Sequence, residues 1–410
     1  MSHCDCDSHH PALMPMEAAL EHLLAAARPV GEQEQLALDA ALGRILAADQ
    51  QSAIQAPPAD NSAMDGYALR TADLSPEGPN RLPVSQRIIA GGVGEPLQPG
   101  SAARIFTGAP VPPGADAVVM QEQTERDGDI VEIRAEVSPG QNIRRAGEDI
   151  DVGQTILEAG CRLRPQELGL AATAGIGELP VFRRVRVAIF STGDELLEPG
   201  EPLTPGKIYN SNRYMLLGLL RALQCDIIDL GVLPDTLDST LDAMRQAAGQ
   251  ADLIVTTGGV SVGEEDHVRA AVEQLGELSL WRINIKPGKP LAFGSVQGAH
   301  FIGLPGNPVS AFVTFLLFAR PFILKLQGAS ALTPPEFTVI ARFDWPRAGS
   351  RQEYLRARYL PDGSGVEIYP HQGSGVLTST VWADGLVVVP PKRVIKAGDR
   401  VGFIPFSELL

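Results

Sequence analysis

The clearest pattern in the chain is an alternation of short apolar runs and longer segments of helical periodicity between residues 185 and 327. Short runs rich in β-branched residues are typical of buried strands, whereas apolar positions spaced three and four apart indicate helices. This alternation predicts a mostly parallel sheet with helices on both faces. We expect strands at 185–190, 226–230, 253–255, 281–285 and 300–302, and helices at 212–223, 237–248, 268–275 and 309–325.

The flanking segments follow other patterns, which predict an α/β multidomain protein. Helical periodicity at 15–50 predicts two helices, the second around Leu36 and Ile45, and 163–174 predicts a further helix. Only short β-like runs occur between, as at 130–133, and again after 333. We therefore expect a helical or elongated domain (12–54 with 151–182), an inserted β-rich domain (55–150), an α/β domain (183–328) and a C-terminal β-barrel-like domain (329–410).

Charge and apolar content narrow the class of protein. The formal charge of −15, from 34 Lys and Arg against 49 Asp and Glu, argues against binding to nucleic acid or to an anionic membrane. The most apolar segment, 309–318, is too short to span a membrane and ends at Arg320 and Pro321, so we expect a buried helix. The first residues lack the charged-then-apolar pattern of a secretion signal, which favours a cytoplasmic protein.

Four cysteines in a chain of this length do not form a disulfide framework. Cys161 and Cys225 lie in apolar segments and are interpreted as buried thiols. The first ten residues hold Cys4, Cys6 and three histidines, a composition that suits either a soft-metal site or a disordered terminus.

The stretch 251–267 is the first candidate for chemistry. A strand-like run opens into a loop of small and hydroxyl residues, and three carboxylates follow, of which Asp266 is the last. Exposed backbone N–H groups suit phosphate, and carboxylates next to phosphate suit Mg²⁺. The stretch is therefore a candidate phosphate-and-metal loop, with a solvated surface turn as the alternative. The loop residues that we expect to contact phosphate are Thr257, Gly258, Gly259 and Ser261.

Ligands of parallel sheets bind beyond the carboxyl ends of the strands, and five predicted strands end in loops rich in Gly, hydroxyl, carboxylate or Lys residues. We expect these loops to form one site. Lys286 and Lys289 would pair with oxyanions, whereas Glu195, Asp235 and Asp266 would hold Mg²⁺ or accept hydrogen bonds. Asp194 has the alternative of capping a helix. The other candidates at this edge are Ser191, Thr192, Gly193, Pro305, Gly306 and Asn307.

The inserted domain holds a second group of candidates, in the segments 60–67, 105–110 and 141–149. These segments combine carboxylates with turn residues, a threonine and adjacent arginines. The alternative for each is a turn with salt bridges. Because the insertion is far from the α/β site in sequence, it need not face that site within one chain and could instead face the site of a second subunit.

Seven segments together carry a family resemblance: 60–70 (DNSAMDGYALR), 105–124 (IFTGAPVPPGADAVVMQEQT), 140–150 (GQNIRRAGEDI), 190–196 (FSTGDEL), 256–267 (TTGGVSVGEEDH), 283–290 (INIKPGKP) and 303–311 (GLPGNPVSA). The chain resembles the MoeA molybdopterin molybdenumtransferases of molybdenum-cofactor synthesis, which are related to the E domain of gephyrin. The resemblance covers nearly the full length and excludes the first dozen residues.

The resemblance implies a homodimer of four-domain subunits, with a MogA-like α/β domain whose site is completed by the partner's inserted domain. It implies that the protein inserts molybdate into adenylylated molybdopterin, releases AMP and needs Mg²⁺ or a similar divalent metal. Arg144 is implied as an anion contact, and Arg282 stands where relatives commonly have lysine. The implied functional residues are Asp65, Thr107, Asp149, Glu195, Asp235, Asp266 and Lys286.

Three alternatives stay open at this point. A scaffold would hold a pterin or another protein of cofactor biosynthesis without turnover, although it would not need the full set of carboxylates. A different nucleotide-dependent hydrolase could use the same α/β fold, although the motifs of the insertion argue against it. Tungstate could replace molybdate, because the two oxyanions have nearly the same charge and shape.

Overall fold

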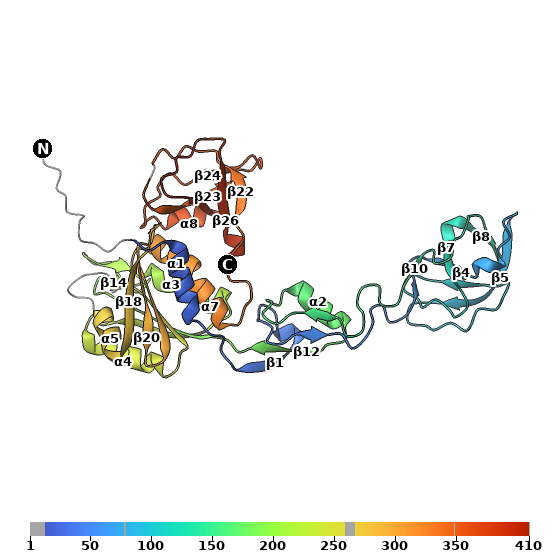
Figure 1. The fold of residues 1–410 in the computed structure, drawn as a ribbon, viewed down its shortest axis with the longest axis horizontal. Helices are drawn as coiled ribbons and strands as arrows, with labels where there is room; N and C mark the ends of the chain where they lie inside the picture. Colours follow the sequence, from blue (N-terminus) through green and yellow to red (C-terminus); the bar gives the residue numbers. More distant parts are fainter. Residues whose placement is uncertain (1–12, 78, 259–266, 348, 410) are drawn as a thin grey trace.

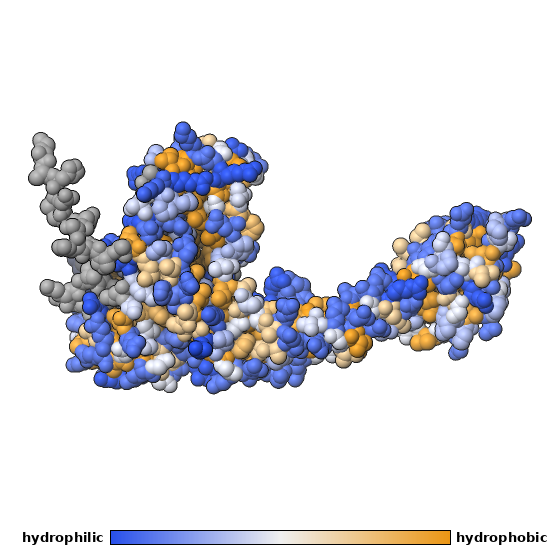
Figure 2. All heavy atoms as spheres, in the orientation of Figure 1, coloured by the Kyte–Doolittle hydropathy of each residue, from blue (hydrophilic) through white to orange (hydrophobic). Residues whose placement is uncertain are grey.

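A computed structural model of the 410-residue chain describes residues 13–77, 79–258, 267–347 and 349–409. The molecule is elongated (Figure 1). The α/β domain and the C-terminal β domain form a block at one end, and the inserted β domain lies at the other end of a narrow connecting arm. Figure 2 shows that the side between the C-terminal and inserted domains is broadly hollowed.

The α/β domain is built on a six-stranded sheet with the order β16-β13-β17-β21-β20-β18. The first four strands are parallel, and β20 runs antiparallel to both of its neighbours. This confirms the predicted class. The strands are β13 (Arg186–Thr192), β16 (Asp226–Leu233), β17 (Leu253–Thr257), β18 (Gly276–Arg282), β20 (Pro290–Val296) and β21 (Ala299–Leu304).

Helices cover both faces of this sheet, because successive side chains of a strand point to opposite faces. In β13, Val187 and Ile189 pack in the core with helices α1 (Met16–Ala26), α3 (Ser211–Ala222), α6 (Pro308–Thr314) and α7 (Arg320–Leu326). Ala188 and Phe190 pack in the opposite core with α4 (Leu237–Ala248) and α5 (His267–Leu275).

The apolar helix at the centre of the domain confirms the predicted buried helix at 309–325. It runs over Pro308–Leu326 and is long and apolar enough to span a membrane, but 94% of its most apolar window is buried inside the protein. The apolar run stops before Arg320 and Pro321, but the helix continues through them. A π-helical segment, η4 (Phe315–Ala319), precedes Pro321. This wider turn accommodates a proline, which lacks the N–H that an α-helix would use.

The structure of the connecting arm differs from the prediction. The segment around Leu36 and Ile45 is not a helix, because β1 (Gln33–Ala37) pairs antiparallel with β12 (Glu178–Phe182) and a short 3₁₀ turn, η1 (Leu38–Ala40), follows. The pairing partner lies far away in sequence, so local periodicity could not reveal it. The other arm elements are β2 (Gln50–Gln51), β11 (Thr155–Leu157) and α2 (Pro165–Thr173), which confirms the predicted third helix.

The inserted domain holds a six-stranded sheet with the order β7-β4-β6-β5-β9-β8. All four residues of β4 are buried, since cores lie on both of its faces. The two chain segments that connect the domain to the arm pair as β3 and β10. The strands are β3 (Asn61–Ser62), β4 (Gly66–Leu69), β5 (Asn80–Ile88), β6 (Ala102–Ile105), β7 (Ala117–Met120), β8 (Thr124–Asp127), β9 (Ile130–Ile133) and β10 (Ile143–Arg144).

The C-terminal domain is a sheet that closes on itself, as expected for a barrel-like domain. Its order is β19-β23-β25-β26-β22, β24 pairs with β23, and a bridge between Ala341 and Val366 joins the two ends. The expected strand 281–285 is wrong as a unit, because β18 ends at Arg282 and β19 joins this second sheet. The elements are β19 (Ile285–Lys286), β22 (Phe337–Ile340), β23 (Gln352–Tyr359), β24 (Val366–Ile368), α8 (Thr378–Trp382), β25 (Gly385–Val389) and β26 (Arg400–Pro405).

Candidate functional site

The carboxyl ends of the four parallel strands lie along one edge of the sheet, as predicted. The register pairs Ser191 with Thr257 and Thr257 with Leu304, so the loops that follow β13, β17 and β21 start side by side. A Cβ atom on Gly306 would lie 3.7 Å from the Cα atom of Gly258, which means that two of these loops touch. The loops that follow β13, β17 and β21 therefore lie at a common edge, as expected.

A first cavity of about 600 Å³ opens at this edge. Thr192 and Thr257 are the last residues of their strands and are nearly buried. Ser191 and Pro305 are buried beside the cavity and do not line it. Gly259, Ser261 and Asp266 lie outside the described residues. The predicted residues that line the cavity are Thr192, Glu195, Thr257, Gly258, Gly306 and Asn307.

Glu195 is the only predicted metal ligand that lines the first cavity among the residues that the structure describes. Its carboxylate is exposed and makes no hydrogen bond with any of them. It packs over Gly193, where φ is +141° and an added Cβ would lie 2.6 Å from Oε2 of Glu195. A glycine is needed here because a side chain would displace the carboxylate. Asp194 does not cap a helix, since β14 (Leu196–Leu197) follows it.

The N-terminus of α3 forms another wall of the cavity. Asn210 is 2% exposed and caps the helix by accepting a hydrogen bond from the Arg213 N–H at 3.2 Å. Its Nδ2 group has no partner among the described residues, and neither has the Oδ1 atom of Asn212. Asn212 donates instead to the Gly306 carbonyl at 2.7 Å. The wall of the cavity thus holds one unsatisfied donor and one unsatisfied acceptor, both buried behind its surface.

Few side chains among the described residues are placed to bind a metal ion. No group of three or more His, Cys, Asp or Glu side chains occurs within them, and Asp235, which is half-buried beyond β16, does not line the first cavity. Glu195 is nevertheless an exposed carboxylate on the cavity wall that has no partner among the described residues. Mg²⁺ commonly takes one or two protein oxygens and completes its shell with water and substrate phosphate, so this carboxylate fits the ion.

Lys286 was expected in the first cavity but lines a second one, of about 710 Å³, at the junction with the C-terminal domain. It belongs to β19 and pairs with Glu353, whose Oε2 atom lies 3.3 Å from its Nζ atom. Arg347 and His371 line the same cavity, which is therefore rich in basic groups. Arg282 and Lys289 lie near the junction of β18 and β20 and line neither cavity.

The inserted domain brings together Asp65 and Thr107, which the sequence had marked in two separate motifs. The Oδ1 atom of Asp65 accepts from the Thr107 N–H at 2.8 Å and from its hydroxyl at 2.9 Å. These bonds, the backbone one first, hold the pKa of Asp65 below its usual value, so the carboxylate is ionised at neutral pH. Arg144 and Asp149 are exposed on the nearby connecting segment. This group lies at the far end of the arm from the first cavity (Figure 1).

The four-part architecture agrees with known proteins along the whole chain. Residues 14–175 match the model described as the MoeA N-terminal region (domain I and II), 188–325 match the probable molybdopterin binding domain, and 338–406 match the MoeA C-terminal region (domain IV). A molybdopterin molybdenumtransferase of Haemophilus influenzae is 44% identical over 386 residues, 92% of this chain and 95% of the relative. The chain belongs to the MoeA family.

Other MoeA relatives support this assignment. Molybdopterin molybdenumtransferase 2 of Mycobacterium tuberculosis is 37% identical and covers 94% of this chain and 97% of its own. The crystal structure of the molybdopterin biosynthesis moeA protein of Pyrococcus horikoshii superimposes with a TM-score of 0.83 at 32% identity, over 96% of this chain and 100% of that chain. The arrangement of domains is therefore one that this family adopts.

Some residues that line the first cavity were not predicted from the sequence. Asn210, Ser211 and Asn212 line it, and an Asn-Ser-Asn run before an apolar helix is a recognisable capping signal that could have indicated them. Gly375 of the C-terminal domain lines the same cavity. Its position had no signal in the sequence, because only the packing of the two domains brings it there.

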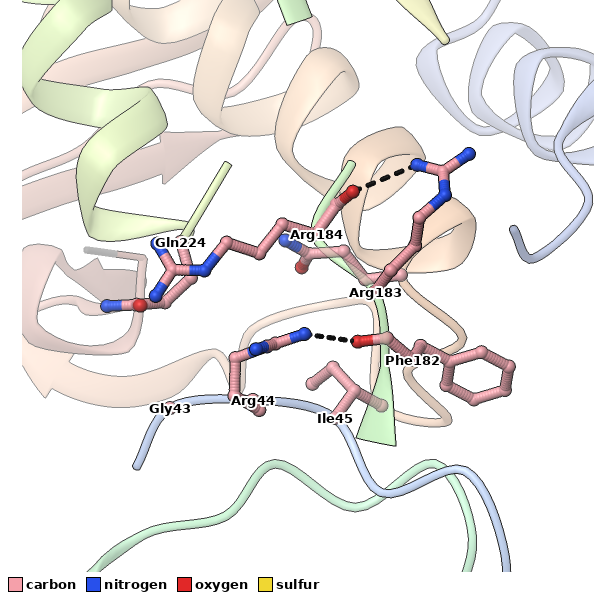
Figure 3. A pocket seen from close by; sticks show the side chains of 8 residues that line it. Gly43, Arg44, Ile45, Phe182, Arg183, Arg184 and Gln224 are labelled. Carbon is pink, nitrogen blue, oxygen red and sulfur yellow. Dashed lines mark hydrogen bonds between the residues drawn. The ribbon is translucent and has the colours of Figure 1, made fainter. Parts of the chain in front are cut away.

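A third, small cavity lies at the junction of the arm and the α/β domain (Figure 3). Arg44 donates to the Phe182 carbonyl at 2.7 Å on one side. On the other, Arg183 forms two hydrogen bonds with the carboxylate of Asp252, at 2.7 and 2.8 Å. Asp252 directly precedes β17, so this pair attaches the arm to the strand that leads into the first cavity. We interpret this junction as structural.

Proposed function

We propose that this protein inserts molybdate into adenylylated molybdopterin and releases AMP. The observation that supports it most is the first cavity, which combines a free carboxylate, two threonine hydroxyls and a helix N-terminus in a chain of the MoeA family. Backbone N–H groups and hydroxyls at strand ends suit the phosphates of such a substrate. Its two phosphate groups and the molybdate dianion need local positive groups in an acidic protein, and the second cavity has them in Lys286 and Arg347.

We also propose that Mg²⁺ assists the reaction. Glu195 would hold Mg²⁺, which when bound would supply Lewis-acid polarisation of the phosphoanhydride. Asn212 would position the Gly306 loop beside it, and Thr192 and Thr257 would hold the phosphate oxygens. The free thiols of Cys161 and Cys225 suit the reducing cytoplasm, where we place the reaction.

The site is proposed to be shared between two subunits of a homodimer. Asp65 and Thr107 form an ordered, ionised group that has no α/β cavity beside it in its own subunit. The hollowed side of the molecule leaves room for a partner (Figure 2). A twofold dimer would bring the inserted domain of each subunit to the first cavity of the other.

The decisive experiment measures AMP release from adenylylated molybdopterin with Mg²⁺ and molybdate. We expect release that depends on both ions and that falls at least about 100-fold in Glu195→Gln, because a metal-binding carboxylate is lost. Glu201→Gln, an exposed carboxylate that does not line the first cavity, is the matched control. Tight substrate binding without molybdate-dependent AMP release would favour a scaffold and contradict the proposal.

A further inference from the structure

Two arginines lie side by side on neighbouring strands of the inserted domain. The register of β5 and β6 places Arg87 directly opposite Arg104, and the register of β4 and β6 places Tyr67 on the other side of Arg104. Directly paired residues project from the same face of a sheet, so these three side chains form one row. Phe106 follows the end of β6 and precedes Thr107.

Aromatic rings hold the two like charges together. The guanidinium carbon of Arg87 lies 4.9 Å from the centre of the Phe106 ring, and that of Arg104 lies 4.6 Å from the same centre. The guanidinium carbon of Arg104 also lies 5.2 Å from the centre of the Tyr67 ring. Each ring face attracts a cation, which offsets part of the repulsion between like charges on adjacent strands.

Neither arginine forms an ion pair with a carboxylate of the described residues. Arg87 is exposed and makes no hydrogen bond with them either. Arg104 is half-buried, and it donates to the Gly66 carbonyl at 3.1 Å and to Oε1 of Gln121 at 2.5 Å. Both acceptors are neutral, so they orient the guanidinium of Arg104 without neutralising its charge.

The arginine pair adjoins the ionised group of Asp65 and Thr107. The pKa of Asp65 is lowered chiefly by the bonds from Thr107 and further by the charge of Arg104, which therefore acts on this carboxylate at short range. Asp65 and Thr107 are the part of the inserted domain that we propose to face the first cavity of the other subunit. The arginine pair would then reach the same cavity.

The first cavity lacks the positive charge that a ligand with two phosphates requires. Glu195 lines it, and no Lys or Arg side chain does so among the described residues. The sequence of the loop after β17, 258–266, holds three carboxylates and no Lys or Arg. Carboxylates and phosphates repel one another unless cations lie between them. A basic group from outside the subunit would remove this imbalance.

We propose that Arg87 and Arg104 of one subunit bind an oxyanion in the first cavity of the other. A guanidinium offers a planar fork of N–H donors that fits two oxygens of a phosphate or a similar tetrahedral oxyanion. The oxyanion is either the diphosphate of the adenylylated molybdopterin or free molybdate, which share this chemistry. The inference rests on the proposed function for the identity of the ligand and on the shared site for its position.

The test compares Arg87→Gln and the double variant Arg87→Gln/Arg104→Gln with two controls. Arg81→Gln removes another exposed arginine of β5, which pairs with Asp127 at 3.5 Å. Phe106→Leu removes the ring between the two arginines and keeps both charges, so it separates the stability of the stack from anion binding. Arg104→Lys keeps the charge and serves if the double variant does not fold.

The first measurement is the KM for the adenylylated molybdopterin and for molybdate in AMP release. Because charge-assisted bonds to an oxyanion are lost, we expect one KM to rise about tenfold in Arg87→Gln and about 100-fold in the double variant, with kcat less affected. The ligand whose KM rises carries the oxyanion. Phe106→Leu should mainly lower the melting temperature. Unchanged KM values in both arginine variants, or an equal rise in Phe106→Leu or Arg81→Gln, would overturn the proposal.

The second measurement uses mixed dimers. In a heterodimer of the double arginine variant with Glu195→Gln, both defects fall in one site, so the other site should keep the wild-type KM and about half of the activity. A heterodimer without activity would contradict the assignment of the arginines to the other subunit's cavity.

The third measurement does not need turnover. Inorganic pyrophosphate and, separately, molybdate are titrated into each dimer with Mg²⁺ by calorimetry. The wild type should bind at least one of them about tenfold or more tightly than the double variant. If the wild type releases no AMP, the proposed function fails. Equal affinities of the wild type and the double variant for both anions would overturn the role of the arginines independently of that result.

Discussion

Two substitutions at opposite ends of the molecule test whether the site is shared between subunits. Asp65→Asn weakens the ionised group that Thr107 holds in the inserted domain, and Glu195→Gln removes the free carboxylate of the first cavity. In the proposed homodimer, each variant alone has one defect in both sites. We therefore expect each to release AMP at no more than about 1% of the wild-type rate.

The shared site predicts the activity of mixtures quantitatively. In a heterodimer of the two variants, both defects fall in one site and the other site is intact. Random exchange of subunits makes half of the dimers heterodimers, so an equimolar mixture should recover about one quarter of wild-type activity. A heterodimer isolated with two affinity tags should recover about one half.

The assay is AMP release after the subunits have exchanged, with dimers verified by light scattering. The matched control is a heterodimer of the wild type with a chain that carries both substitutions. There each site has one defect, so this heterodimer should be inactive. If each chain instead builds its own site, the control would keep half of the activity and the mixture of single variants would recover none. That outcome would refute the shared site.

Three further predictions concern single residues. Gly193→Ala should lower AMP release about tenfold or more and also lower the melting temperature, because its Cβ would displace the Glu195 carboxylate and a φ of +141° strains an L side chain. Asp252→Asn should reduce the free energy of unfolding by about 2 kcal/mol at pH 7, as followed by urea denaturation. Burial is the largest single effect and raises the pKa of Asp252, but the hydrogen bonds from Arg183 and from the Arg186 N–H, with the charges of both arginines, together bring this pKa below its usual value. The stabilisation is therefore present above the unfolded pKa of about 3.9, and the difference from wild type should vanish as the pH falls through the lower folded value. Burial raises the pKa of Cys225 to about 12, so maleimide at pH 8 should modify it only after denaturation, as mass spectrometry would show.

The α/β domain was the part of the fold that the sequence predicted best. Its strands and helices are complete local units, and the alternating faces of β13 leave a periodic trace in the sequence. Elements whose partner is distant were missed. β1 depends on β12, and β19 on β23, so each forms only when another domain segment supplies its hydrogen bonds.

The residues of the candidate site show the same contrast between local patterns, which the sequence reveals, and distant partners, which it does not. That Thr192, Thr257 and Gly306 lie together followed from the rule that parallel strands end at one edge, and the register confirms it. Lys286 was placed at this edge by the same rule, but the prediction failed because its strand crosses to the C-terminal sheet. The pairing of Asp65 with Thr107 joins two motifs of the inserted domain that the sequence marked separately.

Local sequence therefore determined which residues are available for chemistry and which strands carry them, since strand periodicity, glycines at special backbone angles and helix caps act within a few residues. Only the tertiary structure decided which loops share a cavity. Gly375 reaches the first cavity because the C-terminal domain packs against α6, where the Val309 N–H donates to the Ser374 carbonyl. Such packing depends on the shapes of whole surfaces, which short-range patterns along a chain do not encode.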